Sequence, residues 1–71
     1  MDTETAHQID RLARHALGQL NDVLLVARAS CPEDEFVGLK SSVGRIMGAI
    51  VTDVLQPLYA RHPDIIPTEL K

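Results

Sequence analysis

SSVGRIMGAIVTDVL, residues 41–55, is the stretch that decides the fold, because large apolar side chains recur in it at helical spacing. Gly44 and Gly48 lie among them, although each glycine inside a helix costs about 1 kcal/mol relative to alanine. When residues 36–58 are placed on a helical wheel, the apolar and small side chains cover roughly 200°, whereas a surface helix needs ~100° to face one core. One neighbouring helix cannot cover so wide an arc. The stretch therefore predicts a long helix with more than one packing partner.

The N-terminal part of the chain predicts a first helix over residues 4–29. Polar side chains, Asp10 and Arg14 among them, occupy the rest of its circumference, and these two have the (i, i+4) spacing of a weak ion pair. The candidate N-caps are Asp2, Thr3 and Thr5, the last in a capping box with Gln8. The apolar face consists of Ile9, Leu12, Ala13, Ala16, Leu17, Leu20, Val23, Leu24 and Ala27.

ASCPEDEF, residues 29–36, marks a break and a restart. Ser30 or Cys31 can cap a second helix, Pro32 suits its first turn, and the acids that follow complement the positive end of the helix dipole. We predict this helix over residues 32–62. A connection this short makes the two helices antiparallel neighbours.

Two prolines shape the C-terminal end of the chain. Pro57 has no N–H to donate to the carbonyl of Asp53, which predicts a kinked or restarted last turn. Pro63 ends the helix, and residues 63–71 are predicted to form an extended segment on the bundle. The predicted fold class is therefore all-α, an antiparallel helical hairpin with a short C-terminal segment in one domain spanning 1–71.

A single hairpin of this kind would expose a contiguous apolar strip, which soluble monomers rarely tolerate. A chain of 71 residues is also marginal on its own, and its single cysteine forms no internal disulfide. We therefore predict a homodimer in which two hairpins form a four-helix bundle. The predicted interface is the broad face of the second helix, formed by Phe36, Leu39, Val43, Gly44, Met47, Gly48, Val51, Val54 and Leu55.

The glycines allow two interpretations. Gly44 and Gly48 would let the backbone of a second chain approach closely, as small side chains four residues apart permit. Alternatively, they make room for a bulky neighbour in the same chain, such as Tyr59 or Leu24. Lys40 lies within the apolar arc, where its stem can cover apolar surface or its amine can pair with an acid of a partner.

The apolar residues of the C-terminal segment, Ile65, Ile66 and Leu70, also allow two interpretations. They could dock on another protein, or they could form an ordered cap over the open end of the bundle. The cap is the preferred interpretation, because so short a chain has little core of its own.

No arrangement typical of an enzyme is found in the sequence. Glu4 and His7 have the Glu-x-x-His spacing of carboxylate-bridged metal sites, but His7 lies away from the apolar stripe and the acids required on other helices are lacking. Cys31 has no histidine near it in sequence to act as a base, so we predict a structural role for it. Phosphate-binding and dinucleotide-binding motifs are absent. We therefore predict neither catalysis nor a cofactor or metal.

Charge and hydropathy limit the partners. Seven Lys and Arg against ten Asp and Glu give a net charge of −3, which disfavours nucleic acid. Seven residues separate Arg45 from Asp53 in the apolar region, against the roughly 20 needed to cross a bilayer. The lone cysteine and an acidic N-terminus, unlike a signal peptide, predict a cytoplasmic location.

These features predict a small non-enzymatic interaction or regulatory protein that acts as a homodimer. Its first partner is a second copy of itself, and another protein is a further candidate. The alternative is a nucleic-acid-binding regulator whose basic face is assembled by dimerisation from Arg11, Arg14, Arg28, Arg45 and Arg61.

Overall fold

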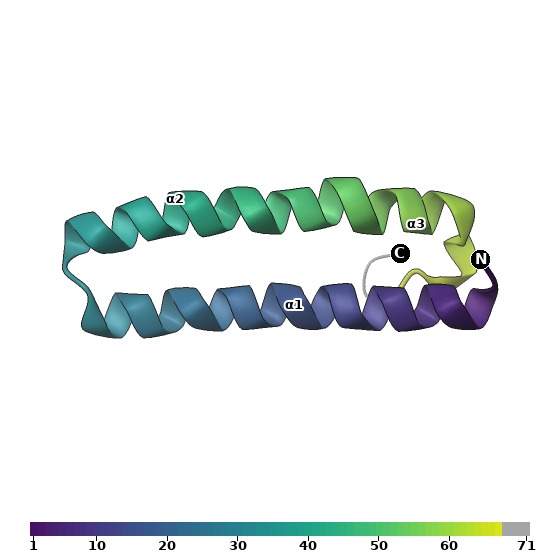
Figure 1. Cartoon of the computed structure of the whole chain (residues 1–71), viewed down its shortest axis with the longest axis horizontal. Helices are drawn as coiled ribbons and strands as arrows, with labels where there is room; N and C mark the ends of the chain where they lie inside the picture. The colour runs from purple at the N-terminus through teal and green to yellow at the C-terminus, as the bar shows by residue number, and fades with distance from the viewer. Residues whose placement is uncertain (68–71) are drawn as a thin grey trace.

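Two antiparallel helical arms joined by a short link make up the computed structural model, which describes residues 1–67 (Figure 1). The first arm is α1 (Thr3–Ser30). The second arm is continuous but consists of α2 (Glu33–Ala49), the π-helix η1 (Ile50–Leu55) and α3 (Gln56–Arg61), followed by the 3-10 turn η2 (Pro63–Ile65). Within the described part there is no β-strand. The predicted all-α helical hairpin is confirmed.

The helix ends differ in detail from the prediction. Asp2 caps α1, because its carboxylate accepts a 2.8 Å hydrogen bond from the Thr5 backbone N–H. At the other end Cys31 is the C-cap of α1, and its N–H donates to the Ala27 carbonyl. Ser30 and Cys31 thus finish the first helix instead of capping the second. The second begins after Pro32, whose fixed φ suits a helix start, and no side chain caps it.

The hydrogen-bond pattern of the second arm changes just before Pro57, from i, i−4 bonds to the i, i−5 bonds of a π-helix. The Gln56 N–H donates to the Val51 carbonyl, five residues back, in the wide turn of η1. The Thr52 hydroxyl donates to the Gly48 carbonyl at 3.0 Å, a bond that often accompanies a bent helix. The predicted interruption is therefore accommodated one turn earlier as a π-helical turn, and the arm continues through the proline.

Because a π-helix turns less per residue than an α-helix, η1 rotates everything that follows it. This rotation keeps Leu55 and Leu58 facing α1, and both are buried. Ile65 on η2 completes the same end of the core by packing with Leu58 and Ala6. Residues 63–65 are therefore a docked 3-10 turn and not part of the predicted extended segment, and Leu70 lies outside the described residues.

The core between the arms is thin for a chain of this size. Its radius of gyration is 14.6 Å, where a compact chain of this length would have about 11 Å. The surface area is 5120 Å², against about 4,400 Å² for a compact monomer of the same mass. No helix among residues 1–67 combines the length and apolarity needed to span a membrane. The buried hydrophobic residues in the described part are Ala6, Ala27, Val43, Leu55, Leu58 and Ile65.

Candidate interaction surface

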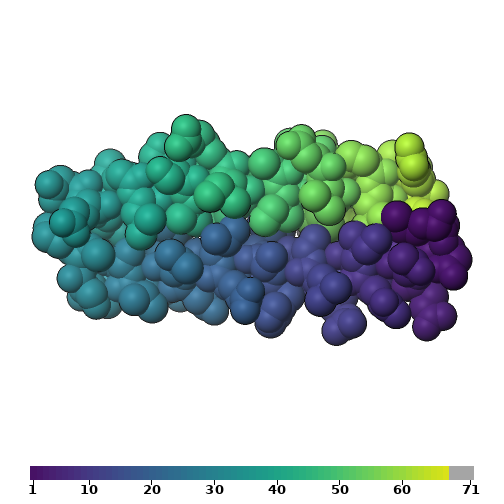
Figure 2. Space-filling view, viewed as in Figure 1, coloured from purple at the N-terminus to yellow at the C-terminus, as the bar shows by residue number. Residues whose placement is uncertain are grey.

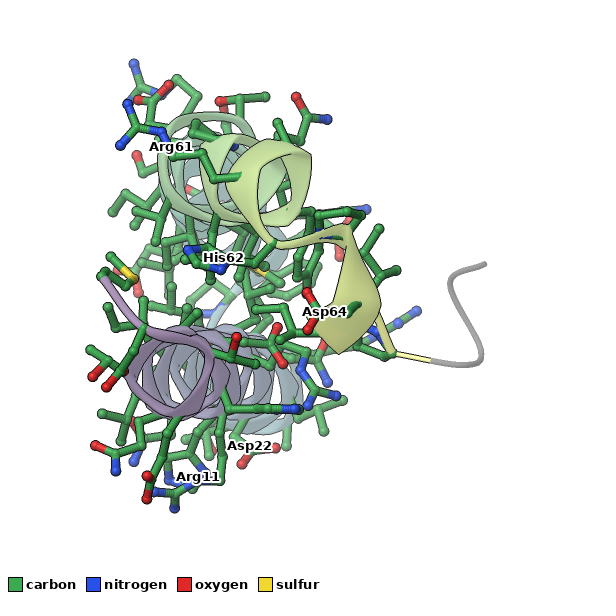
Figure 3. All side chains as sticks on the ribbon, turned by 90° about the vertical axis from the view of Figure 1, so that its right-hand side faces the viewer. Arg11, Asp22, Arg61, His62 and Asp64 are labelled. Carbon is green, nitrogen blue, oxygen red and sulfur yellow. The ribbon has the colours of Figure 1, made fainter. Side chains whose placement is uncertain are left out.

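The hairpin has two broad flanks, one on each side of the plane that contains the two arms. On one side, η2 lies against the helices, and Figure 3 shows this turn, with Asp64, beside the pair of helices. The Tyr59 hydroxyl donates to the Asp10 carboxylate on this side. On the other side, Ile9, Val54 and Arg61 line one cleft. We call these two sides the tail flank and the open flank.

Helical phase, at 100° per residue in α1 and α2 and less in the π-helix η1, assigns the remaining exposed residues to one flank or the other. Figure 2 shows the open flank, where the arms meet along their length. Its large side chains are Leu12 and Val23 on α1, Leu39 and Ile46 on α2, and Val54 on η1, each with 37–59% of its surface exposed. The tail flank carries Leu25, Arg14 and Arg28 on α1, Val37, Lys40, Gly44 and Gly48 on α2, and Val51 on η1.

The charge on the two flanks is very different. On the open flank, α1 presents no charged residue between Thr5 and Ser30, and α2 presents none between Glu35 and Asp53. Arg11 and Asp22 project from the edge of α1 that faces away from the second arm (Figure 3). The middle of the open flank is therefore an apolar strip without charge, which Asp22 borders on α1 and which ends at a cleft lined by Asp53 and Arg61.

A cleft of about 270 Å³ lies at the end of the open flank that is nearest the N-terminus. Apolar side chains, Ile9 and Leu58 among them, line it together with Asp53, Arg61 and His62. His62 lies between α3 and α1, whereas Arg61 is at the outer edge (Figure 3). Small-molecule pockets usually hold about 300–1,000 Å³, so this cleft is better described as the end of a groove between the arms.

Asp10 is buried, contrary to the prediction that it lies on the polar side of the first helix. Only 1% of its surface is exposed. Its carboxylate accepts a hydrogen bond from Tyr59 and lies 3.1 Å from Arg14 Nη2, which confirms the predicted ion pair. A signal was present, because Asp10 follows Ala6 by four residues and precedes Leu17 by seven, on the line of the core.

The Asp10 cluster ties α1 to α3 near the open end of the hairpin. Its carboxylate is engaged by a hydroxyl and a guanidinium, the arrangement that satisfies a buried acid. Among residues 1–67, no group of three or more His, Cys, Asp or Glu side chains could hold a metal ion. The role that this cluster supports is structural, because it holds α3 against α1.

The predicted dimer interface is divided by the structure into four parts. Val43 and Leu55 face α1 of their own chain and are buried. Leu39 and Val54 lie on the open flank. On the tail flank are Gly44, Gly48 and Val51, and at the seam between the arms are the half-buried Phe36 and Met47. Leu12, Val23 and Ile46 are exposed on the open flank and were not among the predicted residues.

The glycines do not make room for a neighbour in the same chain. A Cβ atom added at Gly44 or Gly48 would meet nothing within 4 Å, so neither Tyr59 nor Leu24 requires a glycine there.

The two isoleucines of the C-terminal segment pack against the helices. Ile65 is buried, and Ile66, the C-cap of η2, is half-buried. This pair therefore lies against its own hairpin, as the cap interpretation requires.

The arginines of a single chain are not gathered on one face. Arg14 is engaged by Asp10, and the Arg28 guanidinium carbon lies 5.9 Å from the centre of the Phe36 ring. Arg11 and Arg61 project from opposite edges of the hairpin (Figure 3). The chain matches no protein family, no curated protein and no solved structure.

Proposed function

We propose that the protein is a small non-enzymatic interaction protein that acts as a homodimer, with two hairpins packed into a four-helix bundle. The observation that carries this proposal is the surplus of exposed surface. The chain exposes roughly 700 Å² more than a compact monomer of its mass. A standard protein interface removes about 800 Å² from each partner, which is close to this surplus.

The composition of the core supports the same conclusion. The buried hydrophobic residues of the described part include two alanines, Ala6 and Ala27, whereas larger side chains such as Leu12 and Ile46 remain in water. Burial of apolar surface is the dominant favourable term in folding and in most association. A second hairpin would give these side chains the apolar surroundings that one hairpin lacks.

Thermal unfolding at several protein concentrations tests the proposal. If folding is coupled to dimerisation, dilution destabilises the folded state, and the Tm should fall by about 5 °C or more over a hundredfold dilution. Circular dichroism at 222 nm follows the helices directly. A Tm that is independent of concentration would contradict the proposal.

A further inference from the structure

Both flanks of the hairpin carry exposed apolar side chains, so exposure alone does not choose between them. On α1, Leu12 of the open flank and Leu25 of the tail flank are 59% and 58% exposed. On α2, Ile46 and Val37 form a similar pair on opposite flanks. The choice of contact face must therefore come from charge, access and area.

Charge favours the open flank. A helix that packed on the tail flank would cover Arg28 and Lys40, whereas Arg14 on the same flank is already paired with Asp10. A charged group taken out of water is strongly unfavourable unless it gains a partner, so Arg28 and Lys40 would each need an acid of the second copy. The open flank has less of this cost, because α1 presents no charged residue there from Thr5 to Ser30 and the charged residues of the second arm, Asp53 and Arg61, lie together at the cleft at one end.

Access favours the same face. On the tail flank, η2 packs against both α1 and α3 and occupies one end of the surface (Figure 3). A straight helix could not lie along that flank for its whole length. On the open flank Met1 lines the cleft at one end, and no described segment crosses the rest, so a second hairpin could contact most of its length (Figure 2).

The area is also adequate. The hairpin measures 45 × 20 × 16 Å, and the open flank extends over the two longer dimensions. A face of these dimensions is roughly 900 Å², which is sufficient for the about 800 Å² that each partner of a standard interface buries.

We infer that the two copies meet through the open flank, with Leu12, Val23, Leu39, Ile46 and Val54 at the contact, and that Gly44 and Gly48 lie outside it. This inference rests on the proposed homodimer. In place of a close backbone approach at Gly44 and Gly48, which was one interpretation of the sequence, the contact is an apolar strip to which both arms contribute.

Leu12→Glu and Leu25→Glu form a matched pair that tests the inference. Both change an exposed leucine of α1 to the same helix-forming acid, and they differ only in flank. We expect Leu12→Glu to raise the dimer dissociation constant about a hundredfold or more, because two-fold symmetry places the substitution in the contact twice. Leu25→Glu should leave the dissociation constant within about threefold of the wild type.

Ile46→Glu and Val37→Glu repeat the comparison on α2, so that the test does not depend on one variant remaining folded. Sedimentation velocity gives the dissociation constants, and circular dichroism at high concentration verifies the helix content of every variant. Loss of the dimer in Leu12→Glu and Ile46→Glu alone would support the open flank.

Three results would overturn the inference. They are loss of the dimer in the tail-flank variants alone, equal loss in both pairs, or no loss in either pair. A wild-type chain that is monomeric would instead refute the proposed homodimer, so failure of the face assignment and failure of the proposed function give different observations.

Discussion

Asp10 is the only buried charged residue of the described chain, and the Tyr59 hydroxyl donates a hydrogen bond to its carboxylate. Replacement of Tyr59 by phenylalanine removes that hydroxyl. Asp10 keeps its 3.1 Å ion pair with Arg14, but one hydrogen bond to the buried carboxylate is lost. Hydrogen bonds to charged groups contribute about 1.5–3 kcal/mol, and because Arg14 remains we expect a loss of about 2 kcal/mol per chain. For a chain of this length that corresponds to a fall in Tm of about 8 °C or more.

Urea unfolding followed by circular dichroism, with all variants at one protein concentration, measures the effect. Tyr59→Phe, Asp10→Ala and the double variant complete a mutant cycle, and we expect a coupling free energy of at least about 1 kcal/mol. Because Tyr59 and Asp10 lie on the tail flank, the mass of the Tyr59→Phe protein should be unchanged. A loss in Tyr59→Phe smaller than about 0.5 kcal/mol would show that this contact does not hold α3 against α1.

Three further changes test other parts of the structure. Gly44→Ala with Gly48→Ala should stabilise the chain by about 1–2 kcal/mol in urea unfolding, because the added methyl groups meet nothing within 4 Å; destabilisation would contradict this. Ile65→Ala should cost about 2–4 kcal/mol in the same assay if the docked turn belongs to the core, and a neutral result would count against it. Hydrogen bonds from the Thr5 side chain and backbone N–H lower the pKa of Asp2, so the cap stabilises the helix above about pH 4 and is lost as the pH falls further. In the wild type, the backbone amides of the first turn of α1 should therefore lose protection from hydrogen exchange as the pH falls below about 4. In Asp2→Ala, which lacks the cap, their protection should not depend on acid in this way.

The hairpin itself was predictable because each of its causes is local. Apolar spacing indicated two helices, and the short link at Pro32 made them antiparallel. The π-helical turn was not predictable in the same way. Pro57 removes one donor, but the choice between a kink and a wider turn depends on which option keeps Leu55 and Leu58 against α1.

The burial of Asp10 was missed for a related reason. An acid on an apolar stripe is buried only if partners satisfy it, and its hydroxyl donor, Tyr59, lies 49 residues away in the chain. Sequence spacing did identify Arg14 as one partner. It could not show that a second partner would arrive from the last helix.

The candidate contact face depends on how the two arms are paired. The wide apolar arc of the second arm was correctly recognised, but α1 covers its middle, where Val43 and Leu55 lie. Two exposed margins remain. Which of them lies beside Leu12 depends on the hand of the hairpin and, for Val54 alone, on the wider turn of η1. Only then do Leu12 and Ile46 emerge as parts of one apolar strip.

The absolute mass of the wild-type chain in solution is the measurement that tests the central claim most directly. Sedimentation equilibrium or light scattering at micromolar concentration should give twice the chain mass of 7.8 kDa. A mass of 7.8 kDa throughout the micromolar range would contradict the homodimer and the contact face that depends on it.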